Sequence, residues 1–337
     1  MKKFNDTITA FFILVILGLS CSPAGQDKKL VQFYGQALGT AYSVSYYSNE
    51  GVAYQVEIDS LIAEFNSVFS IYDTASLISE VNNNLITEID NNWFSEILYA
   101  SEIIYKKTNG LFDPTVGSLV NAWGFGTHDR LKMNSDKIDS ILDFTGFDKI
   151  KYNNGVLEKE DIRTKLDFNA IAKGYCVDLV GKLLEQKGIN SYLIEIGGEI
   201  VAKGIKPDST YWRIGIEKPA DKALDKQEVF QIIKLHDRAL ATSGSYRRYF
   251  EEDGRRYSHT INPTTGYPVD NNLLSVTVVA ETCLLADAYA TAFMVMGVEE
   301  TIAFAEKHSD IEVFLIYEDK HKDISIKYTD GFKAIME

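Results

Sequence analysis

Hydrophobic residues recur at two different spacings along this chain, and these spacings separate predicted strands from predicted helices. Residues 31–47 alternate between apolar and polar positions and are rich in β-branched and aromatic side chains, which predicts strands around Gly35 and Gly39. Residues 56–69 and 93–107 carry apolar side chains every third or fourth position, which predicts two amphipathic helices. Asp113-Pro114 has the form of an N-cap followed by proline at the first helical position, so we expect another helix through Val120.

The second half of the chain predicts more strands than helices. A hairpin is expected at Asn153-Asn154-Gly155, and helical spacing returns over residues 170–186. Strand-like runs follow at 192–196, 200–203, 212–217, 229–235, 274–279, 311–317 and 324–328. Thr282 is expected to cap a helix through Val295, and another helix is expected over 298–307. Helices and strands occur in clusters rather than in strict alternation, which predicts an α+β fold, a single domain of mixed sheets and helices.

The N-terminal segment has the pattern of an export signal. Lys2 and Lys3 precede an apolar run at 8–19, which is too short for a comfortable membrane span. Cys21 follows a small residue, as in a bacterial lipoprotein signal, and a plain signal peptide cut nearby is the alternative. We therefore expect a signal peptide at 1–20, a lipidated cysteine and tether at 21–30, and the folded domain at 31–337. The lipid on Cys21 would anchor the exported protein to a membrane, facing the periplasm of a bacterium, with the inner membrane favoured.

Composition narrows the classes of partner. The chain has 337 residues, 45% of them hydrophobic, and a formal net charge of −14 with no Lys/Arg block, which argues against nucleic acid as a partner. A phosphate-rich ligand would need a metal ion or backbone amides to offset this charge. There is no P-loop, no Gly-x-Gly-x-x-Gly after a strand, and no zinc-like spacing of histidines. Cys176 and Cys283 are expected to be buried, and a single bridge between them is left open.

The segment Ser258–Pro268 places one histidine beside a rigid turn. His259 precedes Asn262-Pro263 and Gly266, whose residue types favour tight turns. A histidine held by such a loop can move protons near neutral pH. The alternative for this segment is a surface histidine at the end of a hairpin.

Asp287 and Thr291 form a second candidate site. They lie four residues apart in a helical pattern and therefore share one face of the helix. A carboxylate and a hydroxyl are hard oxygen donors of the kind that Mg²⁺ prefers. A carboxylate within this apolar stretch also needs a partner, although an ordinary helix-surface Asp is the alternative.

Two further segments suggest a site for an anionic, aromatic ligand. Asp167 and Asn169 end a predicted strand, and a helix of small residues follows. Lys173 in the first turn of this helix is unfavourable to the helix dipole, so its position there indicates that an anion binds at the start of the helix. Trp123-Gly124-Phe125-Gly126 offers two aromatic rings on a flexible backbone. The alternatives are a solvated lysine and core aromatic residues at a helix exit.

Seven segments in this order resemble the ApbE family, the FAD:protein FMN transferases. The resemblance begins at Ala37-Leu38-Gly39-Thr40, which precede the seven segments, and the last of the seven is Asp-x-x-x-Thr, residues 287–291. Between them lie Gly-x-Phe-Asp-Pro-Thr-Val-Gly, Trp-Gly-Phe-Gly, Asp-x-x-Ala-Ile-Ala-Lys-Gly-Tyr, Ile-Gly-Gly-Glu, Ala-x-Ala-Thr-Ser-Gly-Ser-Tyr and His-x-Ile-Asn-Pro-x-Thr-Gly. One departure is Phe168-Asn169, where many members carry Asp-x-Gly-Gly or Asp-x-Gly-Ala.

The resemblance implies an activity and a set of site residues. Its members bind FAD and Mg²⁺, cut the pyrophosphate, and transfer FMN to a Ser or Thr hydroxyl of a partner protein with release of AMP. It implies that Asp287, Thr291 and the backbone oxygens of Ala170 and Ala290 hold Mg²⁺, and that His259 is the base. The residues that it places around FAD are Leu38, Phe69, Trp123, Gly124, Phe125, Asp167, Lys173 and Ile261.

The resemblance also implies a partner, an acceptor protein that in this family is a membrane redox subunit. Two other functions remain open at this point. One is a Mg²⁺-dependent FAD pyrophosphatase that passes the same phosphoryl group to water. The other is a flavin-binding lipoprotein without turnover, which would not need His259 or Asp287.

Overall fold

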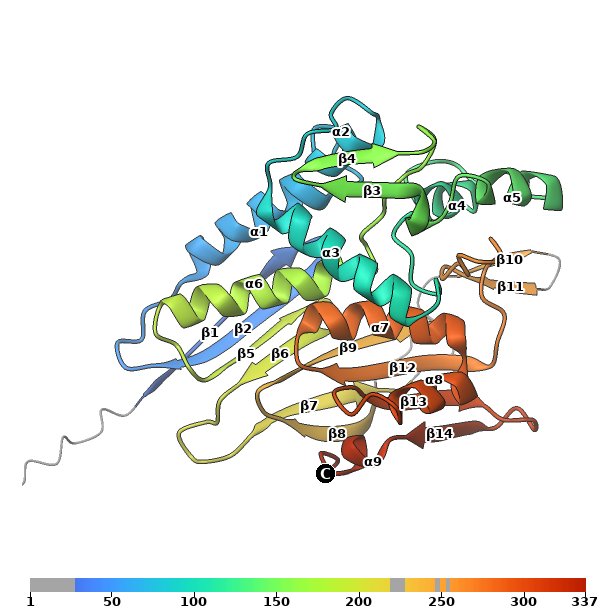
Figure 1. The fold of residues 1–337 in the computed structure, drawn as a ribbon. Coiled ribbons are helices and arrows are strands. Elements are labelled where there is room, and N and C mark those ends of the chain that lie inside the picture. The colour runs from blue at the N-terminus through green and yellow to red at the C-terminus, as the bar shows by residue number, and fades with distance from the viewer. Residues whose placement is uncertain (1–27, 219–227, 246–248, 253–254) are drawn as a thin grey trace, which may run out of the picture.

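A computed structural model describes residues 28–218, 228–245, 249–252 and 255–337 (Figure 1). The predicted signal peptide, Cys21 and most of the predicted tether lie outside the described residues. No helix within the described ranges is both long enough and apolar enough to cross a bilayer.

The centre of the fold is an eight-stranded sheet in which every neighbouring pair of strands is antiparallel. Its strands, in spatial order, are β1 (Lys29–Ala37), β2 (Thr40–Ser48), β5 (Tyr192–Ile196), β6 (Glu199–Lys203), β9 (Arg238–Gly244), β12 (Leu273–Ala280), β13 (Glu312–Glu318) and β14 (Ile324–Tyr328). The sheet therefore joins the first and last strands of the chain into one layer, and the strand-to-helix turns along it carry the site segments.

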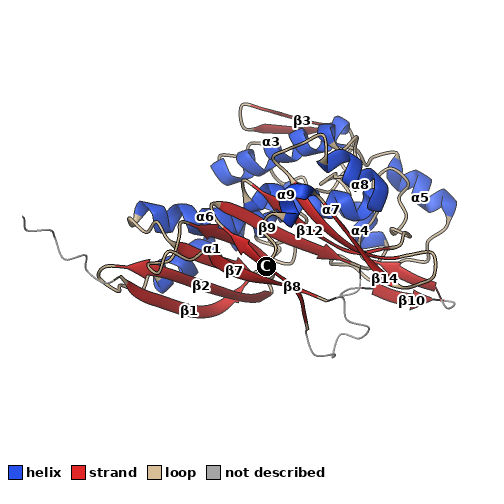
Figure 2. Cartoon of the chain, turned by 90° about the horizontal axis from the view of Figure 1, so that it is seen from below, coloured by secondary structure: helices blue, strands red, loops and turns tan. Residues whose placement is uncertain are grey.

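Helices cover one face of this sheet. They are α1 (Gln55–Phe69), α3 (Asn92–Lys107), α6 (Ala172–Gln186), α7 (Cys283–Met296) and α8 (Val298–Ala305). Figure 1 shows α6 and α7 lying along the sheet, and Figure 2 shows the helices gathered on one side of the strands. The large core forms where the buried side chains of these helices meet the sheet. Burial of this apolar surface holds the two layers together.

A short ribbon covers the other face. Strands β7 (Trp212–Glu217) and β8 (Val229–Leu235) pair with each other and pack beside the short helix α9 (Asp330–Lys333). Trp212 and Ile233 bury their side chains against Leu240, Val279 and Phe314 of the main sheet. The strands of the main sheet are thus buried from both sides in this region, which explains their nearly continuous apolar runs.

The remaining elements form an outer part beyond the helices. They are α2 (Leu77–Asn82), α4 (Gly117–Ala122), α5 (Ser135–Leu142), the 3₁₀ turn η1 (Phe147–Lys149), the hairpin β3 (Ile150–Asn153) and β4 (Val156–Lys159), and the hairpin β10 (Tyr249–Glu252) and β11 (Arg255–Ser258). Both views place α4, α5 and the β10–β11 hairpin at the same end of the molecule. His259 follows β11 directly and so lies at this end.

The α+β prediction is confirmed, and most predicted elements are present within one or two residues. Thr282 caps α7 as expected, since its side chain accepts the Leu285 N–H. The helix predicted from Asp113-Pro114 is wrong, because α4 begins only at Gly117 and Asp113 serves a different purpose, described below. Strand β9 was not predicted. Its Arg-Ala-Leu-Ala-Thr-Ser-Gly sequence is dominated by small residues, which have weak β-propensity, and only its place between β6 and β12 makes it a strand.

Gly174 allows α6 and α7 to approach each other closely. A Cβ added at this position would lie 2.2 Å from the backbone oxygen of Cys283 and 2.8 Å from the Cβ of Asp287. Backbone atoms cannot rotate aside as a side chain can, so any larger residue would force the two helices apart. This contact is the reason that Asp287 lies beside the first turn of α6.

We expect Gly174→Ala to destabilise the protein by about 1–3 kcal/mol, the usual cost of overpacking. Gly181→Ala on the same helix is the control, because its new Cβ would meet only the hydroxyl end of Tyr192, at 2.8 Å. Alanine also improves helix propensity at both positions by about 1 kcal/mol. Urea unfolding of the two variants measures the difference, and equal losses of stability would contradict the close-contact argument.

Candidate active site

Asp287 lies at the contact between α6 and α7. Its Oδ2 accepts the backbone N–H of Gly174 at 2.9 Å, and the side chain is buried. Burial raises the pKa of Asp287, while the nearby Lys173 ammonium and the Gly174 N–H act in the opposite direction. The hydrogen bond engages one carboxylate oxygen, so the second can serve a cation. A buried carboxylate of this kind is costly without a positive partner.

A second carboxylate fixes the start of α7. Asp178 of α6 accepts the backbone N–H groups of Cys283 at 2.9 Å and Leu284 at 2.8 Å. These amides belong to the first turn of α7 and have no partner within the helix. Asp178 therefore fixes the rotation of α7 relative to α6, and with it the direction of Asp287. The predicted burial of Cys176 and Cys283 is confirmed, and both thiols are free rather than bridged.

Lys173 is paired with a carboxylate that arrives from the sheet. Its Nζ lies 2.5 Å from Oε1 of Glu199, the first residue of β6. Burial opposes the charge on Lys173, but the carboxylates of Glu199 and Asp287 outweigh burial and raise its pKa. The Lys173 side chain keeps 33% of its surface exposed, whereas the Glu199 side chain keeps 3%. The ammonium therefore has a buried carboxylate as its partner, while about a third of the Lys173 side chain remains exposed.

The remaining predicted metal donors lie on α7 and in the segment before α6, the two parts of the chain that meet at Asp287. Thr291 is one turn further along α7 and half-buried, Ala290 beside it is fully buried, and Ala170 lies two residues before α6 begins. The described residues contain no cluster of three or more His, Cys, Asp or Glu side chains that could hold a metal. A site here would consist of one carboxylate, one hydroxyl and backbone carbonyls. Such a donor set suits Mg²⁺, which takes few protein ligands and completes its shell with phosphate and water.

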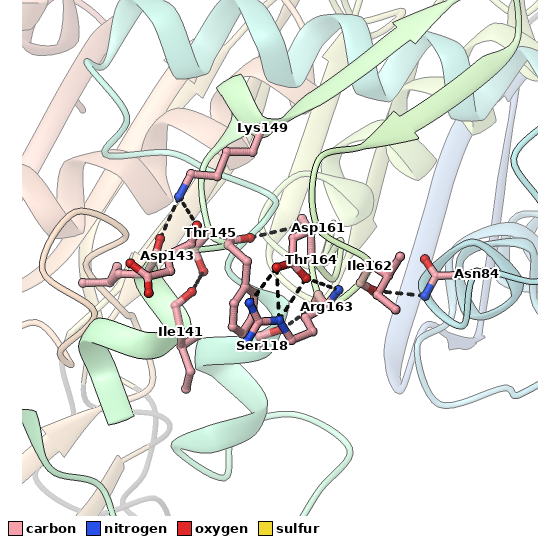
Figure 3. A network of polar contacts seen from close by, with 12 residues as sticks. Asn84, Ser118, Ile141, Asp143, Thr145, Lys149, Asp161, Ile162, Arg163 and Thr164 are labelled. Atoms are coloured by element: carbon pink, nitrogen blue, oxygen red, sulfur yellow. Dashed lines mark hydrogen bonds and ion pairs between the residues drawn. The ribbon is translucent and has the colours of Figure 1, made fainter. Parts of the chain in front are cut away.

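The segment leading to Asp167 is held on several sides. Figure 3 shows Arg163 paired with Asp161, Ser118 donating to the Arg163 carbonyl and Asn84 donating to the Ile162 carbonyl. The Thr164 hydroxyl donates to the Phe144 carbonyl. The Asp167 N–H then donates to Pro114 O at 2.7 Å, and Asp167 Oδ1 accepts the Asn169 N–H at 2.8 Å. Burial raises the pKa of Asp167. This loop therefore reaches the start of α6 in a defined conformation.

Asp113 holds a turn instead of starting a helix. Its Oδ1 accepts the N–H and the hydroxyl of Thr115, and its Oδ2 accepts the N–H of Phe147. Burial raises its pKa to about 6, against the opposing effect of these donors. Since Pro114 O binds the Asp167 N–H, the Asp113 turn connects the Gly-x-Phe-Asp-Pro-Thr segment to the Asp167 loop.

This buried carboxyl predicts a pH dependence of stability. The folded protein keeps the Asp113 proton up to pH about 6, whereas the unfolded chain loses it near its ordinary value of 3.8. Asp113 thus adds stability below pH 4, and this contribution is lost as the pH rises toward 6. We expect the stability of the wild type relative to Asp113→Asn to fall by about 3 kcal/mol over this range, since each pKa unit is worth about 1.4 kcal/mol. Urea unfolding at pH 4, 5 and 7 measures it, and a difference that is constant with pH would contradict it.

The two loops that carry Trp123 and His259 lie against each other. Trp123 Nε1 donates to Gly266 O at 2.8 Å, and the Phe125 and His259 rings are 6.4 Å apart at 71°. Ile261 is buried with Trp123 in a small apolar cluster formed with α4 and α5. Within the His259 loop, the Asn262 side chain accepts the Thr264 N–H and the Gly266 N–H donates to Asn262 O, which gives the rigid turn expected from the sequence.

Leu38 lies in a strained turn near Glu199. It joins β1 to β2 with φ of 51°, a left-handed value that is unfavourable for a leucine. Gly197 lies in the turn between β5 and β6, and its N–H donates to Ala41 O. The Leu38 turn and the Gly197–Glu199 turn are therefore neighbours. Strain of this kind is often found at binding sites.

Phe69 lies in the core behind the site. It is buried and contacts Phe94, Phe168 and Tyr175, with its ring 5.9 Å from that of Phe168. Phe69 thus packs among core rings beside Phe168, and its contact with FAD stays a prediction. Leu38, Asp167 and Lys173 lie at strand and helix ends.

The structure thus gathers two groups of predicted residues. Lys173, Asp287 and their neighbours form one, and Trp123, Phe125, His259 and Ile261 form the other. The Asp167–Pro114 hydrogen bond joins them on one side, and Asn271, beyond the His259 loop, joins them on the other by donating to Met294 O of α7.

Comparison with known proteins gives this arrangement a family. The sequence profile of the ApbE family matches residues 38–315, a range that includes all the predicted site residues from Leu38 to Thr291. The chain belongs to the ApbE family.

Two curated relatives carry the same name, FAD:protein FMN transferase. The FAD:protein FMN transferase of Vibrio cholerae is 38% identical over 330 residues, which cover 95% of both chains. The protein of the same name from Haemophilus influenzae is 33% identical and covers 100% of this chain and 99% of its own.

Solved ApbE structures share the fold. The flavin transferase ApbE from Vibrio cholerae superposes with a TM-score of 0.81 at 35% identity, covering 91% of this chain and 99% of that one. The apo form of the Pseudomonas stutzeri flavinyl transferase ApbE also gives 0.81, at 34% identity over 91% and 97% of the two chains.

Two residues of this ApbE-family chain, Glu199 and Asp178, were not assigned a role from sequence, and a third, Asp113, was assigned a different one. Glu199 belongs to the Ile-Gly-Gly-Glu segment, whose pairing with Lys173 depends on strand order. Asp178 lies five residues after Lys173 within α6, where an acidic residue on a helix ordinarily faces solvent. Asp113 was expected to be a cap. An acidic residue next to glycine or within an apolar stretch was the available signal in each case.

Proposed function

We propose that this protein transfers FMN from FAD to a Ser or Thr hydroxyl of an acceptor protein, with release of AMP, in a Mg²⁺-dependent reaction. The observation that carries the proposal is the placement of Lys173 and Asp287 side by side, next to the Asp167 loop, with His259 on a rigid neighbouring loop. Family membership and the names of the curated relatives support the same activity.

The residues present fit a Mg²⁺ ion. Asp287 is a buried carboxylate whose pKa is raised by burial, so a cation beside it would remove the cost of its charge. Asp287, Thr291, Ala170 O and Ala290 O would hold the ion. When bound, Mg²⁺ would neutralise the diphosphate and stabilise the AMP leaving group.

The chain's own residues position the reactants. Lys173 and Asp167 would contact FAD near the start of α6, where the free backbone amides of the helix would also bind its diphosphate. Leu38, Ile261 and the backbone of Trp123, Gly124 and Phe125 would line the space for its rings. In an acidic protein these local groups provide the binding site that the overall charge disfavours.

His259 would accept the proton of the acceptor hydroxyl. The hydroxyl oxygen forms a bond to the phosphorus of the FMN half, the bridging bond of the diphosphate breaks, and AMP leaves with that bridging oxygen. Phe125 lies against the His259 ring and limits its movement. With water in place of the hydroxyl, the same steps would give FMN and AMP, which is the pyrophosphatase alternative.

We further propose that the protein is exported and attached to a membrane through lipid on Cys21, facing the periplasm. The basic start, short apolar run and Cys21 in the sequence support this. The acceptor would then be a membrane redox subunit. Labelling of the expressed protein with a radioactive or alkyne fatty acid, with Cys21→Ser as the control, tests the anchor.

The transfer is tested with the protein lacking residues 1–21, FAD, Mg²⁺ and a peptide containing Asp-Gly-x-Ser/Thr-x-Ala/Thr. Mass spectrometry measures the FMN adduct on the peptide, and chromatography measures AMP and free FMN. An adduct in equal amount to AMP supports the transferase. AMP and free FMN without adduct would indicate the pyrophosphatase, and bound, intact FAD would indicate a flavin carrier.

A further inference from the structure

Glu199 is a buried charged residue beside Lys173 whose carboxylate is only partly satisfied. It follows the Gly197-Gly198 turn, is 2% exposed, and brings a carboxylate into the space behind Lys173. Oε1 is paired with Lys173 Nζ at 2.5 Å, but Oε2 is buried without a hydrogen-bond partner. An unsatisfied buried carboxylate oxygen costs free energy, so its retention calls for a functional reason.

The position of Glu199 alters the charge that FAD would meet. Glu199 and Asp287 are two carboxylates around one ammonium, and both act on Lys173. Burial and the Asp287 carboxylate raise the pKa of Glu199, while the Lys173 ammonium acts in the opposite direction. At a pH at which all three groups are ionised, the group is net negative. The diphosphate of FAD is anionic, so this group repels it until a divalent cation is added beside Asp287.

The pairing also restrains Lys173. The ammonium is held by Glu199 on its buried side, and its helix-start position is unfavourable for a cation. Lys173 alone therefore cannot provide a strong anion site while Glu199 neutralises it. A phosphate oxygen competes for Lys173 only when a second positive charge lies nearby.

We propose that Glu199 makes FAD binding depend on prior binding of Mg²⁺, by neutralising Lys173 and keeping the metal-free site net negative. This inference rests on the proposed function, since it takes FAD as the ligand. It assigns Glu199 a positioning and charge-setting role, separate from any contact with the reacting atoms.

The test compares FAD dissociation constants in MgCl₂ and in EDTA, by flavin fluorescence, with chromatography to confirm that FAD stays intact. Glu199→Gln keeps the shape and an acceptor for Lys173 but removes the charge. We expect it to bind FAD in EDTA about tenfold or more tightly than the wild type, because one unit charge within the site is worth at least that factor. The ratio of the FAD dissociation constant in EDTA to that in MgCl₂ should therefore be lower in Glu199→Gln than in the wild type.

Glu195→Gln is the matched control. Glu195 lies on the adjacent strand β5, and its Oε2 accepts a long hydrogen bond of 3.4 Å from the Ser43 hydroxyl. Glu195→Gln changes the net charge of the protein by the same amount as Glu199→Gln. The ratio of its two FAD dissociation constants should therefore equal that of the wild type. Glu199→Met, of similar length and also neutral, repeats the measurement if Glu199→Gln does not fold, as judged by urea unfolding.

The outcomes separate this inference from the proposed function. A neutral Glu199 variant whose ratio equals that of the wild type, or one that binds FAD more weakly in EDTA, would overturn the inference alone. A wild-type protein that does not bind FAD even in MgCl₂ would overturn the proposed function and the inference with it.

Discussion

Asp287→Asn should abolish Mg²⁺-dependent FAD turnover, with a loss of roughly 10³-fold or more, as expected when a main electrostatic contributor is removed. Asparagine can still accept the Gly174 N–H that Asp287 Oδ2 now accepts at 2.9 Å, so the contact between α6 and α7 is kept. The change therefore removes the charge with little change of shape. Isothermal titration with MgCl₂ measures the loss of metal binding, and AMP release measures the loss of turnover.

Asp178→Asn is the control for this variant. It changes another buried carboxylate between the same helices, one that holds the first amides of α7. We expect it to cost about 1–3 kcal/mol of stability, since those amides lose a charged acceptor, while Mg²⁺ binding is retained. Chelator-insensitive turnover in Asp287→Asn would show that Asp287 is not the metal ligand.

His259→Ala should retain FAD but slow transfer to the acceptor by roughly 10²–10⁴-fold, the usual contribution of a general base. The Trp123–Gly266 hydrogen bond, which holds the two loops together, does not involve the imidazole. FAD affinity should therefore change little. Single-turnover formation of the FMN–peptide adduct measures the rate, and flavin fluorescence measures the affinity.

His308→Ala provides the comparison for His259→Ala. His308 is stacked on Phe304 after the end of α8, with ring centroids 4.1 Å apart, and belongs to no predicted site segment. Its replacement should leave the transfer rate unchanged. An unaltered rate in His259→Ala itself would remove His259 from the role of base and leave it as a wall of the pocket.

The helices and turns of the site were predictable because their causes are local. The spacing of apolar residues placed α1, α3, α6 and α7, and Thr282 capped α7 as its residue type indicates. The Asn262–Gly266 turn formed as expected from asparagine, proline and glycine. The motifs that carry Lys173, His259 and Asp287 were also evident, because each needs only residue types in a short order.

Tertiary contacts decided the cases in which one residue type has two uses. Asp113-Pro114 has the local form of a helix start, but Phe147, 34 residues later, supplies an N–H that makes it a turn anchor. Strand β9 has little strand signal and is a strand because β6 and β12 lie on either side of it. Phe69 has the apolar character of a pocket wall or of a core residue, and the rings of Phe94, Phe168 and Tyr175 place it in the core.

By itself, the sequence determined the fold class, most of the elements and the residue types available for chemistry. The tertiary structure decided which charges meet. Gly174 sets the distance between α6 and α7 and so places Asp287, and the order of strands brings Glu199 to Lys173. The reason is physical: helix periods and turns depend on neighbours in the chain, whereas the energy of a buried charge depends on groups that only folding brings near.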